Sequence, residues 1–205
     1  MKNQTILIAI IGLTIMASCV GSQLNPPYSY NSNPNYTWGY AEFYGAYYAE
    51  YKNPNHVISL SLFSDSLKIN DIGNLVGIGQ YLFLEDVFIP ITDTLLTTGT
   101  YTIDDSGKPF SIAVGKNDTI DNVIYPIGAS ISYFEGNTVM SRQKLITQGT
   151  ITISKFGLRY NVICNLKTSD KKELKGSFTA LLPQTNLALA KPNNVNRKRL
   201  IYLQK

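Results

Sequence analysis

The fold of this chain is decided by residues 149–182, which read GTITISKFGLRYNVICNLKTSDKKELKGSFTALL. Apolar and polar side chains alternate along this stretch, which is interrupted by turn residues at 155–157 and 169–173. Alternation with a period of two is typical of a β-strand that buries one face, and short turns join antiparallel neighbours. Residues 149–182 therefore predict three consecutive antiparallel strands, a β-meander.

The chain from residue 38 onward follows the same pattern of short strands separated by turn residues. No stretch of ten or more residues shows a helical period. We expect the earlier strands at 38–51, 57–63, 80–89, 99–103, 110–114 and 123–134. So many antiparallel strands must close on themselves or form two packed sheets, because long open edges aggregate. The predicted class is all-β, an antiparallel meander that closes into a barrel, with a β-sandwich as the alternative.

The N-terminus has the pattern of a bacterial export signal. Lys2 is followed by an apolar run from Ile6 to Ile15 and then by Met-Ala-Ser-Cys at 16–19. An apolar residue, two small residues and a cysteine resemble the lipobox that signal peptidase II recognises. The resemblance implies cleavage before Cys19 and acylation of that residue. The apolar run is shorter than the about 20 residues that a transmembrane helix needs.

Composition divides the chain into four parts. We expect a lipoprotein signal peptide at 1–18, a lipidated flexible tether at 19–36, a β-domain at 37–184 and a basic tail at 185–205. The last fifteen residues contain no acid, whereas the body before them has a small net negative charge. The cations of the tail are Lys191, Arg197, Lys198, Arg199 and Lys205. A body of this charge does not indicate nucleic-acid binding.

Several strand and turn segments resemble those of small lipoproteins of the Bacteroidetes. The matching segments are Gly-Thr-Tyr-Thr at 99–102, Gly-Thr-Ile-Thr-Ile-Ser at 149–154, Arg-Tyr-Asn-Val at 159–162 and Lys-Gly-Ser-Phe at 175–178. The resemblance implies a calycin-like, or lipocalin-like, barrel, in some cases accompanying a nutrient importer. Val20 follows the cysteine where an inner-membrane signal would have Asp, which by the same resemblance favours the outer membrane. Whether the domain faces the periplasm or the cell surface stays open.

Tyrosines gather in the first predicted strand. Its odd-numbered residues from 39 to 51 are uncharged and suit the core, whereas its even-numbered face carries two glutamates and large rings. Rings with a polar tip supply rigid contact area of the kind used in glycan and peptide sites. Packing against neighbouring strands is the other interpretation. The candidate binding residues are Trp38, Tyr40, Tyr44 and Tyr48.

No pattern in the chain indicates catalysis or metal binding. His56 is the only histidine and follows a turn, so a zinc site of the usual kind lacks ligands. Glu85 and Asp86 are adjacent and would point to opposite faces of a regular strand, which makes them poor partners in acid–base chemistry. Cys164 occupies an apolar position of its strand and is expected to be buried. We expect a protein that is not an enzyme and that needs neither cofactor nor metal.

Three short segments resemble the O-glycosylation motif of exported Bacteroidetes proteins. They begin at positions 65, 93 and 118, and their candidate acceptors are Ser66, Thr94 and Thr119.

Together, the patterns of the whole chain predict a non-catalytic accessory lipoprotein of the outer membrane that binds a glycan, a peptide or a nutrient-importer complex. The alternative is a structural or adhesive lipoprotein that works through protein–protein contact.

Overall fold

The computed structural model describes residues 30–188, except residues 65, 121 and 136–141. In these ranges the chain is almost entirely β-structure without an α-helix, and its strands close into an eight-stranded barrel, which confirms the predicted all-β barrel. No helix in these ranges has the length and apolarity needed to cross a membrane. The predicted signal peptide, Cys19, most of the tether and most of the tail lie outside the described residues.

The elements are β1 (Asn35–Gly45), the 3-10 helix η1 (Ala49–Tyr51), β2 (His56–Ser64), β3 (Leu67–Ile69), β4 (Leu75–Ile89), β5 (Gly99–Ile103), β6 (Ser111–Ile112), β7 (Lys116–Ile120), β8 (Val123–Ile127), β9 (Ala129–Glu135), β10 (Arg142–Phe156), β11 (Arg159–Thr168), β12 (Glu173–Leu174), β13 (Ser177–Leu181) and β14 (Gln184–Asn186).

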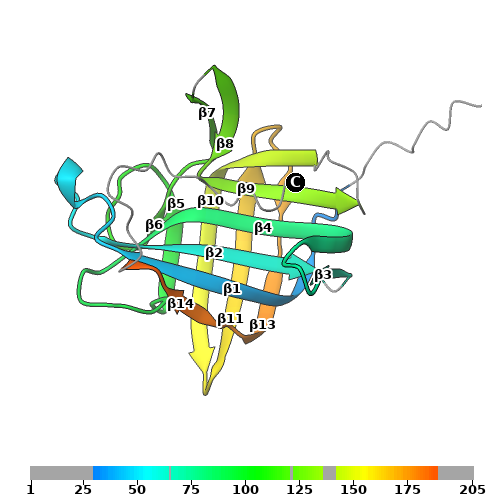
Figure 1. Ribbon diagram of the computed structural model, residues 1–205, viewed down its shortest axis with the longest axis horizontal. Coiled ribbons are helices and arrows are strands. Elements are labelled where there is room, and N and C mark those ends of the chain that lie inside the picture. The colour runs from blue at the N-terminus through cyan, green and yellow to red at the C-terminus, as the bar shows by residue number, and fades with distance from the viewer. Residues whose placement is uncertain (1–29, 65, 121, 136–141, 189–205) are drawn as a thin grey trace, which may run out of the picture.

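Hydrogen bonding runs all the way round the barrel (Figure 1). The strand order is β1, β2, β4, β6, β5, β10, β11 and β13, and β13 pairs with β1 again. The long strands β4 and β10 are bridged twice, by β9 along their first halves and by β6 and β5 further on. β7 and β8 form a separate hairpin that projects from the barrel.

The first and last strands of the barrel pair in parallel, which the antiparallel meander did not predict. Strand direction reverses at every step of the circuit β1, β2, β4, β9, β10, β11, β13. Because this circuit has an odd number of strands, β1 and β13 point the same way. β14 adds a second parallel segment beside β1, so the sheet continues to Asn186, beyond the predicted boundary at 184.

Two predicted strands end earlier or divide, and both changes occur at glycines. β1 stops at Gly45, whose φ of 64° lets the chain turn toward η1, so the strand predicted at 38–51 is too long. The strand predicted at 123–134 is two strands, because the chain bends at Gly128, where φ is 74°. The strands β3 and β7 were not predicted, because they are short and lack a continuous apolar face.

The interior of the barrel is filled with side chains. The rings of Tyr36, Tyr101 and Phe178 are buried there among aliphatic residues from the surrounding strands. Tyr36 points inward although it is even-numbered, because the pairing of β1 with β2 shifts between Tyr36 and Trp38. Cys164 is a buried thiol in this core, as predicted, and its burial raises the pKa of the thiol to about 12.

Candidate functional site

One side of the barrel, where β1, β2, β4 and β9 lie next to one another (Figure 1), is buried on both of its faces. The inward residues of β2 belong to the core, yet outward residues such as Val57 and Ser59 are also almost completely buried. The outward face of a barrel strand is normally polar and solvated. We call this surface the outer wall. It consists of Trp38, Tyr40, Glu42, Tyr44, Val57, Ser59, Ser61, Phe63, Tyr81, Phe83, Glu85, Asp86, Ser130, Ser132 and Phe134.

Aromatic rings fill one half of the outer wall. Phe63 lies at its centre, and the Trp38 ring stacks on it with centroids 4.0 Å apart and planes 8° apart. The rings of Tyr40 and Tyr81 lie 5.9 Å and 5.6 Å from that of Phe63. The Trp38 Nε1–H group donates a hydrogen bond to the carbonyl oxygen of Leu67 at 2.7 Å, which fastens the β3–β4 hairpin against the rings. Burial raises the pKa of the Tyr40 hydroxyl, as expected for a ring packed inside the protein.

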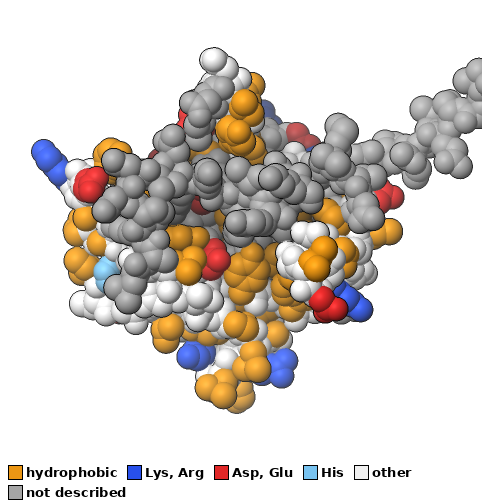
Figure 2. Space-filling model, in the orientation of Figure 1, with side chains coloured by type: hydrophobic (Ala, Val, Ile, Leu, Met, Phe, Trp, Pro, Cys, Tyr) orange, Lys and Arg blue, Asp and Glu red, His pale blue; other side chains and the backbone are white. Residues whose placement is uncertain are grey.

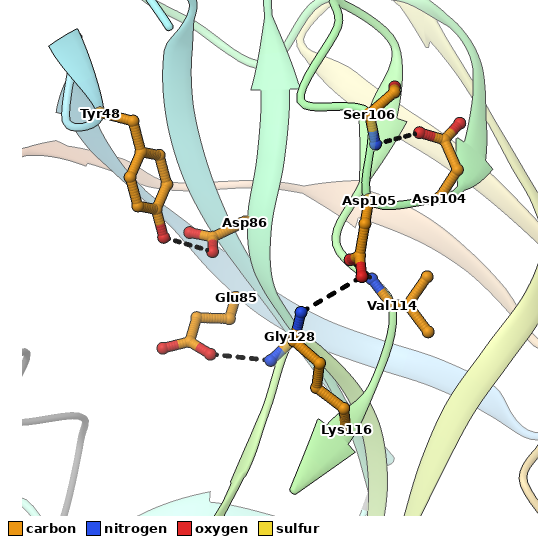
Figure 3. Close-up of polar contacts among 9 residues, drawn as sticks. All are labelled: Tyr48, Glu85, Asp86, Asp104, Asp105, Ser106, Val114, Lys116 and Gly128. Carbon is orange, nitrogen blue, oxygen red and sulfur yellow. Dashed lines mark hydrogen bonds and ion pairs between the residues drawn. The ribbon is translucent and has the colours of Figure 1, made fainter. Parts of the chain in front are cut away.

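A β-bulge brings acidic side chains together in the other half. The pairing of β2 with β4 shifts between Ile58 and Leu60, so two residues of β4, Glu85 and Asp86, lie opposite Ser59. The residues on either side of this pair face the core, and both carboxylates therefore lie on the outer side of β4, as Figure 3 shows. The prediction that they point to opposite faces is wrong, because it assumed a regular strand.

Both carboxylates of the bulge accept hydrogen bonds from other parts of the chain (Figure 3). The Tyr48 hydroxyl, in the turn before η1, donates to Asp86 Oδ2 at 2.7 Å. The Gly128 N–H group, between β8 and β9, donates to Glu85 Oε2 at 2.9 Å. Glu85 and Asp86 are only 4% and 7% exposed. Carboxylates shielded from water in this way interact strongly with N–H, O–H and cationic groups.

Glu42 extends the acidic half onto β1. Its Oε2 atom accepts hydrogen bonds from the Tyr44 hydroxyl at 2.9 Å and from the Ser59 hydroxyl at 3.1 Å. Ser59 pairs with Glu42 on one side and faces the bulge on the other, so the three carboxylates of the wall lie in one row across β1, β2 and β4. Among the described residues, no group of three His, Cys, Asp or Glu side chains is arranged to hold a metal ion.

The loop between β5 and β6 uses its carboxylates differently. Asp105 accepts a hydrogen bond from the Val114 N–H group at 3.0 Å and pairs with Lys116 at 3.2 Å, and Asp104 accepts one from the Ser106 N–H group at 2.8 Å (Figure 3). The side chains of the ion pair are more than half exposed. Exposed ion pairs contribute only about 0–1 kcal/mol to stability. These contacts fix the loop and are not part of the buried acidic half.

The β10–β11 hairpin ends in strongly exposed hydrophobic side chains. Phe156 is 89% exposed and Leu158 is 78% exposed, on either side of the turn residue Gly157. Lys155 and Arg159 flank them. In Figure 2, hydrophobic groups with cationic groups on both sides gather at the lowest point of the molecule, where Figure 1 places the end of this hairpin. Exposed hydrophobic groups with a polar rim are typical of interaction sites.

Two hollows of the described surface lie outside the filled lumen. One, of about 290 Å³, is lined by residues of β10, β11 and β12, including Gln148 and Asn165. Another, of about 390 Å³, lies between the β7–β8 hairpin and the start of β10, near Lys144 and Asp170.

The chain matches no known family model, no curated protein and no solved structure. The geometry of its surface is therefore the basis of a functional proposal.

The structure divides the four predicted binding residues between the two halves of the outer wall. Trp38 and Tyr40 belong to the aromatic half, and Tyr44 belongs to the acidic half. Tyr48 lies beyond the end of β1, and its hydroxyl reaches the acidic half at Asp86. The four residues therefore do not form one strip along one strand.

Tyrosines lead from the acidic half toward solvent. The rings of Tyr44, Tyr47, Tyr48 and Tyr51 follow one another edge to face, with centroid distances of 6.2, 5.0 and 6.4 Å, and Tyr51 is 80% exposed. The prediction that Tyr47 and Tyr51 face the core is wrong, because β1 ends at Gly45 and the alternation ends with it.

The remaining candidates from the sequence have simple positions. His56 Nδ1 lies 2.7 Å from the carbonyl oxygen of Asp93, and its ring packs edge-on against Phe43, so it fixes the entry to β2. The candidate glycosylation acceptors are all exposed: Ser66, Thr94 and Thr119.

The Glu85–Asp86 bulge is the main feature that sequence reasoning missed. Its signal is the three-residue step between apolar residues at 84 and 87, where a regular strand would have a step of two.

Proposed function

We propose that this protein is a non-catalytic accessory lipoprotein of the outer membrane that binds a protein partner, such as a nutrient-importer complex, through the tip of the β10–β11 hairpin. The observation that carries the proposal is the exposure of Phe156 and Leu158 between the cations Lys155 and Arg159. Aromatic and arginine side chains dominate the binding energy of protein interfaces. The ladder of paired residues between β10 and β11 continues to the tip, so the tip is held rigidly.

The direction of the hairpin favours a protein partner over lipid headgroups. Tyr30, the first described residue, has Lys144 Nζ over its ring at 4.6 Å, close to the start of β10. Phe156 lies twelve residues beyond Lys144 on the same strand, which at roughly 3.3 Å per residue is a chain length of about 40 Å and less through space, because β10 bends near Gly149 (Figure 1). A lipid on Cys19 would be joined to Tyr30 by eleven residues, which span at most about 40 Å. An anchor joined to Tyr30 would meet the barrel near the start of β10, whereas the tip lies at the other end of that strand, and this separation supports a partner other than the lipid.

The filled lumen supports a surface contact rather than the transport of a small molecule. Lipocalin-like barrels that carry ligands need an open interior, whereas Tyr36, Tyr101 and Phe178 occupy the interior of this one. The barrel then acts as a rigid support for its hairpins. This supports the accessory role and favours the importer complex over a ligand held inside the barrel.

Photo-crosslinking in cells tests the proposal. A photoreactive residue in place of Phe156 should crosslink to one membrane protein, and Leu158→Ser in the same chain should weaken the crosslink. The matched control is the same photoreactive residue at Thr152, which is exposed on β10 but away from the tip. Equal crosslinking from both positions, or crosslinks to lipid alone, would contradict a protein-binding tip.

Cys19→Ala tests the anchor separately. The variant should leave the membrane fraction and lose the tip crosslink, because the domain would no longer be held near its partner. Unchanged membrane pelleting of Cys19→Ala, without acyl mass on the native protein, would contradict the lipoprotein part of the proposal.

A glycan is the second candidate ligand, favoured by the row of tyrosines that reaches solvent at Tyr51. Exposed rings beside carboxylates are suited to stacking on a sugar and accepting its hydroxyl protons. Tyr51→Ala should then weaken retention of the protein on a polysaccharide column, while Phe156→Ser leaves retention unchanged. The reverse result would support the hairpin tip alone.

A further inference from the structure

The middle of the outer wall is buried although no described strand or helix crosses it. Ser61, Ser130 and Ser132 face outward there, each 2% exposed or less. The β3–β4 hairpin packs on the aromatic end, and the other substantial contacts of β2, β4 and β9 are with their neighbours in the sheet. Ser132 Oγ makes no hydrogen bond to any described residue. Ser130 Oγ accepts a hydrogen bond from Gln143 Nε2 at 2.9 Å and Ser61 is bonded to the Tyr40 hydroxyl, so Ser132 is the buried serine for which a covering segment would supply the partner.

We propose that residues 197–203 of the C-terminal tail lie across the outer wall as a strap. The segment reads Arg-Lys-Arg at 197–199 and Leu-Ile-Tyr-Leu at 200–203. The outer wall has an acidic half followed by an aromatic half, which is the order of the basic and apolar parts of this segment. Its acidic half, with Glu42, Glu85 and Asp86, would receive the three cations, and its aromatic half around Phe63 would receive the apolar residues.

The described chain ends beside the acidic half. The Leu187 N–H group donates a hydrogen bond to the carbonyl oxygen of Phe43 at 2.8 Å, and Ala188 lies against Gly45 at the end of β1. Arg197 is nine positions beyond Ala188, a stretch that can span up to about 30 Å. The bulge on β4 lies two strands from β1, about 10 Å away. Arg197 is therefore well within reach, and a tail that leaves Ala188 meets the acidic half first.

The length of the tail segment also agrees with the length of the outer wall. Asp86 and Tyr81 are five residues apart on β4, about 17 Å. Arg199 and Leu203 are four residues apart and, when extended, span about 13 Å. A basic triplet over the bulge therefore places residues 200–203 over the rings.

The N-terminal segment fits this surface less well. The chain enters the described structure at Tyr30, whose hydroxyl donates to the Glu173 carbonyl oxygen, and Asn31 exchanges hydrogen bonds with the side chain of Gln80. Residues 19–29 contain no cation. A second barrel is also a poor complement, because the body of the chain is negatively charged.

A paramagnetic label on the tail tests the strap. The full-length chain with Cys19→Ala and Leu203→Cys takes a spin label at position 203, since Cys164 is buried and remains protonated. The amide signals of Phe83 and Ser132 should then lose most of their intensity in nuclear magnetic resonance spectra. Reversing the charges with Arg197→Glu, Lys198→Glu and Arg199→Glu should restore them. Reversal of three exposed cations away from the hairpin tip, at Lys108, Lys167 and Lys171, is the matched control and should leave the broadening intact.

The alternatives give different results. Full intensity at Phe83 and Ser132 in the labelled native-charge chain would overturn the proposal, as would broadening that survives charge reversal of the tail. Broadening that appears only when labelled chains are mixed with isotope-enriched unlabelled chains would assign the wall to a second copy and would also overturn it. None of these outcomes depends on the hairpin tip or on its partner.

Discussion

Replacing Trp38 separates the packing role of the aromatic half from a binding role. The Trp38 ring stacks on the buried Phe63 and its Nε1–H group is bonded to the Leu67 carbonyl oxygen. Truncation of large buried aromatic residues to Ala costs about 3–5 kcal/mol. Trp38 is only partly buried, so we expect about 3 kcal/mol for Trp38→Ala, of which about 1 kcal/mol comes from the lost hydrogen bond. Trp38→Phe keeps the stack and should cost only about 1 kcal/mol.

These costs convert into melting temperatures that are easily resolved. For a chain of this size, 1 kcal/mol lowers the midpoint by about 2–4 °C, so Trp38→Ala should melt about 6–12 °C lower and Trp38→Phe about 2–4 °C lower. Tyr44→Ala is the matched control on the same strand, because Tyr44 is half-buried and its hydroxyl bonds to Glu42 rather than to a neighbouring hairpin. It should cost about 1 kcal/mol. Circular dichroism is the assay, since Trp38 is the only tryptophan and its fluorescence is lost with it.

The order of the three variants decides the interpretation. If Trp38→Ala melts within a degree or two of the native protein and loses binding to a partner, the ring belongs to a binding surface and the packing argument is refuted. If Tyr44→Ala lowers the melting temperature more than Trp38→Ala does, the acidic half contributes more to folding stability than the aromatic half, contrary to this prediction.

Two further predictions concern the core and a turn. Burial raises the pKa of Cys164 to about 12 from an ordinary value of 9.0, so the thiol should resist a maleimide at about pH 8 in the native protein and react fully in guanidinium. Because the folded pKa lies above the unfolded one, this contribution to stability is complete below about pH 9 and is lost as the pH rises toward 12, a trend that denaturant titrations at several pH values should detect. A Cβ on Gly128 (φ 74°) would lie 2.3 Å from the Val114 carbonyl oxygen, so Gly128→Ala should destabilise by more than about 1 kcal/mol in chemical denaturation. Gly73→Ala is its control, with a similar φ of 82° and open space around the added carbon, and an equal loss in both variants would exclude the steric cause.

The last third of the barrel could be predicted because its signals are local. The strands expected in 149–182 correspond to β11, β13 and the second half of β10, with turns where the sequence places them. Each strand there is covered by the core on one face and by water on the other, as the alternating burial of β11 shows. Under these conditions the pattern of side chains alone specifies the strand and its orientation.

The outer wall could not be predicted because its burial depends on contacts between distant parts of the chain. Ser59 and Ser61 indicate a solvated face, yet both are buried on the outer side of β2, between β1 and β4. Likewise, the turn that carries Tyr48 meets Asp86 across 38 positions of sequence. The bulge itself left a readable sign in the apolar spacing, but reading it requires the register of a neighbouring strand.

The distribution of polar groups in this barrel argues that its outer wall and its hairpin tip serve different purposes. Carboxylates cost several kcal/mol when they are moved out of water without compensation, so the burial of Glu85 and Asp86 has to be matched by nearby donors. Hydrogen bonds from Tyr48 and Gly128 supply two of these, and a basic strap would supply charge as well. Phe156 and Leu158, in contrast, project into water from a rigid hairpin. A partner that covers them gains apolar contact with little ordering of the hairpin, because the hairpin is already fixed. If the two proposals hold, the outer wall serves contact within the chain and the tip serves contact with a partner, so charge reversal in the tail and truncation of Phe156 should affect different measurements.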